Sequence, residues 1–290
     1  MAGVSERLRS KRIAIVGTGN MGRAILSGLR RAGFPMDQVT ASRRKADHLG
    51  PIQKEFGVAI TTEPAKAEAG ADIVVLAVKP QALAKVATSL RPSVGKEGRV
   101  YVSVAAGISI AHLEELIPRV PLARAMPNLA CGVGEGMTCV AFGGGAAEEE
   151  RALVIDLFNA LGRTVEVDED LMDAVTGLSG TGPMYVFIVI ESLSDAGVKV
   201  GLSRHDANVL ASKTVLGAAK MVVDSGEHPI FLKDKVTSPG GTAIAALHVM
   251  EKSGLRAIFM DAVEAATRRS RELGAANHEG EGRKPRKSEG

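Results

Sequence analysis

Short apolar runs alternate with helical patterns over the first half of the chain. The runs that predict strands occupy residues 13–16, 39–41, 58–60, 72–78 and 99–104. Between them, segments such as 44–56 carry apolar residues at helical spacing. This alternation predicts an α/β fold, a doubly wound parallel sheet with helices on both faces. The segments that follow the strands then meet at the carboxyl edge of the sheet, where ligands bind.

The pattern changes near residue 167. Further strands are predicted at 120–124, 134–141 and 163–167, around a helix at 148–161. After them, long helical patterns rich in Ala and Gly follow at 169–176, 183–197, 204–225, 242–254 and 255–273. We therefore predict four segments: a flexible N-terminus (1–10), a sheet domain (11–167), an all-helical domain (168–274) and a disordered tail (275–290), which lacks apolar periodicity.

Composition excludes several classes of protein. The length of 290 residues suits two domains, and 45% hydrophobic with 24% charged residues is a normal globular balance. Aromatic residues make up 3% and the net charge is only +3, which argues against nucleic-acid binding by base stacking. The apolar runs at 73–78 and 184–190 are too short to span a bilayer, so no membrane association is expected.

The first twelve residues lack the apolar core of a signal peptide. Cys131 and Cys139 are the only cysteines, which suits a reducing, cytoplasmic location. No two histidines have the spacing of metal ligands on one helix face, and we expect no metal site.

A glycine-rich turn carries the strongest cofactor signal of the first half. It lies between the strand at 13–16 and an amphipathic helix, and it matches G-x-G-x-x-G. The first glycine allows a tight turn, the second lets the backbone approach a pyrophosphate, and the third lets the helix pack on the strand. The context predicts a Rossmann-type dinucleotide site formed by Gly17, Thr18, Gly19, Asn20, Met21 and Gly22.

The end of the second predicted strand discriminates between cofactors. NAD enzymes place an acidic residue there for the ribose hydroxyls, whereas this chain has Ser42, Arg43, Arg44 and Lys45. A hydroxyl and three cations suit a 2′-phosphate, so NADPH is favoured and NADH remains possible. The alternative is a solvated basic helix start, which the helix dipole makes less favourable.

The stretch 236–243 reads Val-Thr-Ser-Pro-Gly-Gly-Thr-Ala and precedes a predicted helix. A helix that opens on a glycine pair leaves backbone N–H groups free, and its dipole favours a small anion such as a carboxylate or phosphate. The hydroxyls of Thr237, Ser238 and Thr242 are within reach of that position. The alternative is an ordinary helix start with Thr242 as its N-cap.

Seven motifs in order make the chain resemble the pyrroline-5-carboxylate reductase family from about Arg12 to Gly274. They begin at Gly17, Val78, Ser103, Arg124, Gly177, Asp195 and Val236 and read G-T-G-N-M, V-K-P-Q, S-V-A-A-G, R-A-M-P-N, G-L-S-G-T-G-P, D-A-G and V-T-S-P-G-G-T. The resemblance implies that the C-terminal all-α domain dimerises. The helical domains of such homodimers interlock, one subunit's loop completes the other's site, and dimers often assemble into rings.

The resemblance also implies a reaction, the reduction of 1-pyrroline-5-carboxylate to L-proline by hydride transfer from NADPH, the last step of proline biosynthesis. The implied cofactor contacts are the glycine turn with Ser42, Arg43, Arg44, Val78, Lys79, Pro80, Ala105, Ala106, Gly107 and Asn128. The implied substrate contacts are Glu169, Ser238, Gly240, Gly241, Thr242 and Ala243.

The chain departs from the family pattern at Ala243, where a threonine is usual and is expected to reach the substrate nitrogen. Thr242 or Ser238 could substitute as the catalytic hydroxyl, solvent could protonate the nitrogen, or catalysis could be impaired. Pro64 is a second departure, since the family commonly has Asn there. The rival hypotheses are a related cyclic-imine or hydroxy-acid reductase and a catalytically impaired nucleotide-binding homologue. The hydroxy-acid rival is disfavoured because no lysine is convincingly placed after residues 177–183.

Overall fold

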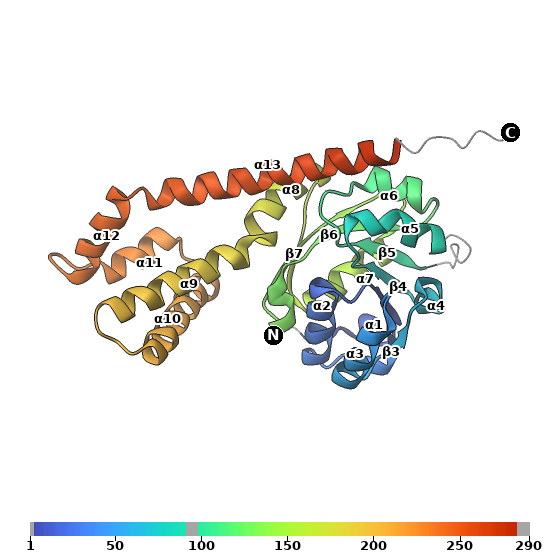
Figure 1. The fold of residues 1–290 in the computed structure, drawn as a ribbon, viewed down its shortest axis with the longest axis horizontal. Coiled ribbons are helices and arrows are strands. Elements are labelled where there is room, and N and C mark those ends of the chain that lie inside the picture. The colour runs from blue at the N-terminus through green and yellow to red at the C-terminus, as the bar shows by residue number, and fades with distance from the viewer. Residues whose placement is uncertain (1–2, 91–97, 283–290) are drawn as a thin grey trace. The chain divides into compact units, whose positions relative to one another are not determined.

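Residues 3–90 and 98–282 are described by a computed structural model of the chain (Figure 1). The chain divides into two compact units. The first comprises Met1–Thr181 and Ala265–Gly290, and the second comprises Gly182–Glu264. Each unit is described by itself below.

The first unit contains one sheet of eight strands within the described residues. These are β1 (Ile13–Val16), β2 (Val39–Ser42), β3 (Ala59–Thr61), β4 (Ile73–Leu76), β5 (Val100–Ser103), β6 (Leu122–Met126), β7 (Gly136–Phe142) and β8 (Gly162–Glu166). Their order is β3-β2-β1-β4-β5-β6-β7-β8, and every neighbouring pair is parallel except β6 and β7. The predicted doubly wound α/β fold is therefore confirmed.

The antiparallel β6–β7 pair has a local cause. Only a short connection, with one 3₁₀ turn η4 (Leu129–Val133), separates the two strands. A parallel pair needs a crossover of a dozen or more residues, so the chain has to reverse direction here.

Helices cover both faces of this sheet. They are α1 (Glu6–Arg9), α2 (Asn20–Arg31), α3 (Leu49–Phe56), α4 (Pro64–Glu68), α5 (Pro80–Leu90), α6 (Ile110–Leu116), α7 (Glu148–Asn159) and α8 (Met172–Val175). Side chains alternate along β1, as strand geometry requires. Ile13 and Ile15 join a core with α2, α3 and α7, whereas Ala14 and Val16 join a second core with α4, α5 and α6. Each fully buried Ile or Leu contributes roughly 1.5–3 kcal/mol to folding.

Helices extend into both of the end segments that the sequence predicts to be flexible or disordered. Leu8 is completely buried, and Ser5 caps its short helix by accepting a hydrogen bond from the Leu8 amide at 3.1 Å. The last helix, α13 (Leu255–Gly282), runs past the expected start of the tail at residue 275. Extending an anchored helix avoids the cost of nucleation, and residues 275 and 276 are alanines. Residues 1–2 and 283–290 lie outside the described part.

A buried ion pair lies beneath one face of the sheet. Arg99 pairs with Glu68, and the Tyr101 hydroxyl donates a hydrogen bond to the same carboxylate. All three side chains are almost fully buried. Burial, followed by the hydrogen bond to Glu68, raises the pKa of Tyr101 to about 12.

The second unit is helical. Its helices are α9 (Gly182–Lys199), α10 (Arg204–Ser225), α11 (Pro229–Val236), α12 (Thr242–Lys252) and the first part of α13. The bounds predicted for α10 are those observed. The sequence pattern missed α11, although Pro229 at its first position and a His228 side chain that accepts from the Ile230 amide are typical helix-start features.

Many large apolar side chains of the second unit are exposed. Examples are Phe187 at 61%, Val200 at 80% and Met260 at 71%. Among the described residues, one helical stretch, Glu169–Lys199, is long and apolar enough by length and composition to cross a membrane. Its unbroken apolar run, residues 184–190, is short, so run length alone does not reveal the stretch. Apolar patches of this kind mark surfaces that another molecule covers.

The proposed domain boundary near residue 167 coincides with the end of the sheet, because β8 ends at Glu166. The first compact unit nevertheless extends beyond this boundary to Thr181, and it also includes the residues from Ala265 onward. The connection between β8 and α9 consists of η5 (Glu169–Leu171), α8 and the π-helical turn η6 (Thr176–Gly180).

Candidate functional site

The glycine turn is packed tightly against the end of β4. Gly17 directly follows β1 and has φ of +103°, a conformation that favours glycine. A Cβ added there would lie 2.6 Å from the Ala77 carbonyl oxygen. The Gly17 amide donates to the Ser42 carbonyl at 3.0 Å, which joins the turn to the end of β2. The sequence thus needs glycine at this position for both its backbone conformation and its close contacts.

The turn leads into the N-terminus of α2, where polar groups remain unsatisfied. The N-cap is Gly19, which offers no capping side chain, and the first turn has no acidic residue. A Cβ on Gly19 would meet no atom within 4 Å. Thr18 is 1% exposed, yet its hydroxyl oxygen has no hydrogen-bond partner in the described structure. Free N–H groups, open space and a helix dipole together suit an anion such as a pyrophosphate.

Gly22 has a different role from Gly19. A Cβ added at Gly22 would overlap the carbonyl oxygen of Gly17. The first turn of α2 therefore packs directly on the turn that precedes it. Gly22 is therefore required for close packing of the backbone, whereas Gly19 leaves open space beside the start of α2.

The basic segment after β2 approaches the same turn. One guanidinium nitrogen of Arg43 donates to the Thr18 carbonyl at 3.0 Å, and the Arg43 amide donates to the Thr61 carbonyl at 3.2 Å. Ser42 is buried, while Arg44 and Lys45 are exposed. Arg43 and Arg44 precede the 3₁₀ turn η2 (Ala46–His48), and Lys45 is the N-cap residue of that turn.

Three more segments that are predicted to contact the cofactor lie at the same edge of the sheet, each just after the end of a strand. Residues 78–80 follow β4, residues 105–107 follow β5, and Asn128 follows β6. Since β1, β4, β5 and β6 are mutually parallel, their carboxyl ends share one edge. Lys79 is exposed, and Gly107 is buried with φ of +70°.

Asn128 is held by three hydrogen bonds. Its side-chain oxygen accepts from the amides of Ala130 at 3.2 Å and Met137 at 3.4 Å. Its amide nitrogen donates to the Ser179 carbonyl at 3.2 Å, within the π-helical turn. Asn128 thus connects the ends of β6 and β7 to that turn. This role was not evident from its sequence motif.

Glu169 is paired inside the first unit. One of its carboxylate oxygens accepts from the Ile110 amide at 2.7 Å and from Arg124 at 3.2 Å. The buried Arg124 also lies 3.8 Å from Asp173, whose carboxylate accepts a 2.6 Å hydrogen bond from Ser270. Sequence reasoning missed this network, and the only signal for it was a cation within an otherwise apolar strand.

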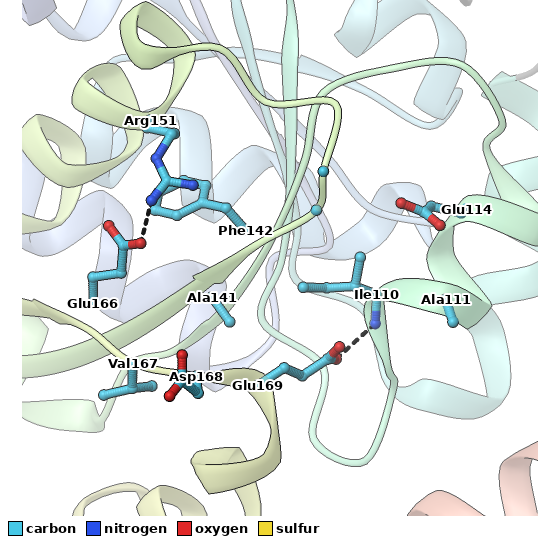
Figure 2. A pocket seen from close by; sticks show the side chains of 12 residues that line it. Ile110, Ala111, Glu114, Ala141, Phe142, Arg151, Glu166, Val167, Asp168 and Glu169 are labelled. Carbon is cyan, nitrogen blue, oxygen red and sulfur yellow. Dashed lines mark hydrogen bonds and ion pairs between the residues drawn. The ribbon is translucent and has the colours of Figure 1, made fainter.

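Glu169 also lines a pocket of about 370 Å³ in the first unit (Figure 2). Its other charged lining residues are Glu114, Glu166, Asp168 and Arg151, which pairs with Glu166 and stacks on Phe142. None of the other predicted site residues lines this pocket, so it is separate from the glycine turn. Among residues 3–90 and 98–282, no three His, Cys, Asp or Glu side chains are arranged so that they could hold a metal ion.

The Pro-Gly-Gly loop lies in the second unit, between α11 and α12. Gly240 has φ of +68°, and the Gly241 amide donates to the Ser238 carbonyl at 3.1 Å. The N-cap of α12 is Gly241 with no side-chain hydrogen bond. Thr242 is the first helical residue, so the expected alternative of a Thr242 cap is wrong, because the glycine already occupies that position.

Two family models match the chain. One, for pyrroline-5-carboxylate reductase dimerisation, covers residues 169–273. The other, for NADP oxidoreductase, coenzyme F420-dependent, covers residues 12–107. The two matches correspond to the helical region and to the glycine-turn half of the sheet.

Curated relatives match the chain along most of its length. The pyrroline-5-carboxylate reductase of Arabidopsis thaliana is 43% identical over 91% of this chain and 96% of the relative. That of Methanosarcina acetivorans is 41% identical over 92% and 99%.

Among solved structures, a pyrroline-5-carboxylate reductase from Coxiella burnetii has a TM-score of 0.84 at 32% identity, covering 91% of this chain and 98% of that one. The Plasmodium falciparum pyrroline carboxylate reductase with NADP bound has a TM-score of 0.83 at 31% identity, covering 92% and 99%.

Proposed function

The chain belongs to the pyrroline-5-carboxylate reductase family, and on this premise we propose that it reduces 1-pyrroline-5-carboxylate to L-proline with NADPH in proline biosynthesis. The observation that carries the proposal is the glycine turn. An open helix N-terminus and an unsatisfied buried hydroxyl lie together there at the carboxyl edge of the sheet.

The residues of this turn fit a dinucleotide. Gly19 leaves room for a pyrophosphate next to the first N–H groups of α2, and Thr18 offers a hydroxyl that lacks a partner in the described structure. The absence of an acidic residue from the first turn of α2 removes a repulsive charge. When bound, the nicotinamide supplies the hydride, and the protein provides position and electrostatics.

Arg43 supports NADPH over NADH. Its guanidinium already reaches the glycine turn, and Arg44 and Lys45 are exposed beside it. We propose that Ser42, Arg43 and Arg44 bind the 2′-phosphate, since charge-assisted hydrogen bonds to phosphate are about twice as strong as neutral ones. Residues 78–80, residues 105–107 and Asn128 would line the ribose and nicotinamide side.

The Pro-Gly-Gly loop would bind the substrate carboxylate. We propose residues 240–243 for this contact, because the N–H groups of the first turn of α12 suit a carboxylate for the reason that the α2 terminus suits a phosphate. The Gly241 amide itself donates to the Ser238 carbonyl and so shapes the loop. Ser238 and Thr242 are exposed hydroxyl groups next to those amides and could hold a proton near the imine nitrogen. Ala243 offers no hydroxyl. General acid help contributes roughly 10²- to 10⁴-fold to such reactions.

We propose that Glu169 does not touch the imino acid itself and acts through the residues that it binds. Its carboxylate is engaged by Arg124 and by the Ile110 amide. We therefore propose a positioning role for it in place of direct substrate binding.

A homodimer explains the exposed apolar faces of the second unit. The match to the dimerisation family and the exposure of α9 and α10 support burial by a partner subunit, with interlocked helical domains and assembly into a ring as the finer proposal. On this proposal the stretch Glu169–Lys199 is covered by protein and not by lipid. Two free cysteines fit a cytoplasmic location.

Ala243 favours one alternative, a nucleotide-binding homologue with impaired catalysis. A hydroxy-acid reductase is less favoured, since the only lysine of α9 is Lys199 at its last position. A steady-state assay with NADPH separates these hypotheses by comparing 1-pyrroline-5-carboxylate, its six-membered analogue and a short 3-oxo acid, the oxidised form of a β-hydroxy acid. The proposal predicts turnover of the five-membered imine with proline as product. NADPH binding without turnover of any substrate would support the impaired homologue.

A further inference from the structure

Two backbone segments that are far apart in the sequence meet at Gly107 and Gly274. Gly107 lies in the loop after β5, and Gly274 lies in the last part of α13. A Cβ added to Gly107 would lie 2.9 Å from the Gly274 nitrogen and 3.2 Å from its Cα. A Cβ added to Gly274 would lie 3.3 Å from the Gly107 carbonyl oxygen. The two backbones are therefore in direct contact, with no space for a side chain between them.

The same face of α13 is fixed by a second contact. Ser270 precedes Gly274 by one helical turn and so lies on the same face. Ser270 is 3% exposed, and its hydroxyl donates to Asp173 at 2.6 Å. Asp173 in turn lies 3.8 Å from the buried guanidinium of Arg124.

Arg124 extends this network to the end of the loop that connects β5 to α6, where α6 begins at Ile110. It donates to Glu169 at 3.2 Å, and Glu169 accepts from the Ile110 amide at 2.7 Å. Ile110 is only three residues beyond Gly107. The loop is thus held at Gly107 by α13 and at Ile110 by a network that begins at Ser270 of the same helix.

Strand order indicates which part of a dinucleotide this loop would face. The β2 end, with Arg43, lies on one side of β1, and β4 and β5 lie on the other side. A pyrophosphate at the β1 turn with its phosphorylated ribose toward β2 directs the nicotinamide toward β4 and β5. The loop that α13 holds is the one that follows β5.

We propose that the C-terminal part of α13, residues 265–276, positions the loop Ala105–Gly107 against the nicotinamide half of the cofactor. Gly274 and Ser270 are the positioning residues. The proposal rests on the proposed dinucleotide site. It assigns to a helix that begins in the other compact unit a specific effect on the reactive end of the cofactor.

The test compares two ligands in the full-length protein. NADPH carries the nicotinamide, whereas 2′-phospho-ADP-ribose retains the phosphates and adenosine but lacks it. Gly274→Val is expected to weaken NADPH binding and to slow single-turnover hydride transfer by roughly ten- to a hundredfold, as misplacement of a reacting group by about 1 Å does. Its affinity for 2′-phospho-ADP-ribose should match that of the wild type. Ala275→Val, at an exposed neighbouring position, is the matched control and should change neither ligand.

Gly274→Ala and Ser270→Ala should also weaken NADPH binding, but less than Gly274→Val does. If the valine variant does not fold, these two variants are compared with the wild type in its place. Equal loss of both ligands, or wild-type behaviour of all three variants, overturns the proposal. A wild-type chain that binds NADPH but reduces no imine contradicts the proposed function, while the two-ligand comparison still decides the positioning role. A wild-type chain that binds neither ligand overturns both.

Discussion

Replacing Gly19 and Gly22 separately by alanine should have different consequences, although the two residues are only three positions apart. Gly19 has φ of −73° and ψ of −163°, which alanine adopts freely, and its added Cβ meets no atom within 4 Å. Gly19→Ala should therefore change the free energy of unfolding by no more than about 0.5 kcal/mol. Its methyl group would occupy the space that a pyrophosphate needs.

The cost to binding can be worked out from the contacts at risk. Displacing a phosphate from one hydrogen bond to a charged group costs about 1.5–3 kcal/mol, which is roughly a 10- to 100-fold weaker Kd for NADPH. Gly22→Ala instead places a Cβ onto the Gly17 carbonyl oxygen. Overpacking of this kind costs roughly 1–3 kcal/mol of stability, so this variant should lose both thermal stability and NADPH affinity.

The assays are fluorescence titration with NADPH and thermal unfolding of the same preparations. The reasoning predicts a normal Tm with weak binding for Gly19→Ala, and a lowered Tm with weak binding for Gly22→Ala. It is refuted if Gly19→Ala binds NADPH as the wild type does, or if both variants lose the same stability.

Three further predictions concern other parts of the molecule. Because the pKa of Tyr101 is raised to about 12 in the folded protein, the unfolded chain loses this proton first as pH rises, and stability should fall between about pH 10 and 12 by on the order of 2–3 kcal/mol. Tyr101→Phe should lower stability at neutral pH through loss of the hydrogen bond to Glu68, yet show a smaller decline over that range in urea titrations. Ala243→Thr should raise kcat/KM for 1-pyrroline-5-carboxylate by roughly 5- to 100-fold, since one hydrogen bond is worth about 1–3 kcal/mol; no gain would exclude a role for this position. Arg43→Ala should weaken NADPH binding more than NADH binding, and an equal loss for both would contradict its assignment to the 2′-phosphate.

Local patterns in the sequence determined much of this account. The strand at 13–16 and the helix 204–225 have the predicted bounds, because apolar periodicity and flanking turn residues are local signals. The glycine turn was equally readable, since its motif combines a strand, a tight turn and a helix within a few residues.

Contacts between segments that are distant in the sequence could not be predicted from such local patterns. The pairing of Arg124 with Glu169, the bond from Ser270 to Asp173 and the approach of Gly107 to Gly274 span 45, 97 and more than a hundred positions. No periodicity encodes such pairs. The strand β7 was predicted at 134–141, but its antiparallel direction was not, because direction depends on the length of the connection and not on the residues of the strand.

Hydride transfer to the imine carbon is the central claim, and labelled cofactor tests it most directly. The protein is incubated with 1-pyrroline-5-carboxylate and NADPH that carries deuterium at the transferred position, and the product is analysed by mass spectrometry. The account predicts proline with one deuterium on a ring carbon and faster formation with NADPH than with NADH. Absence of proline, or proline without the label, would contradict it.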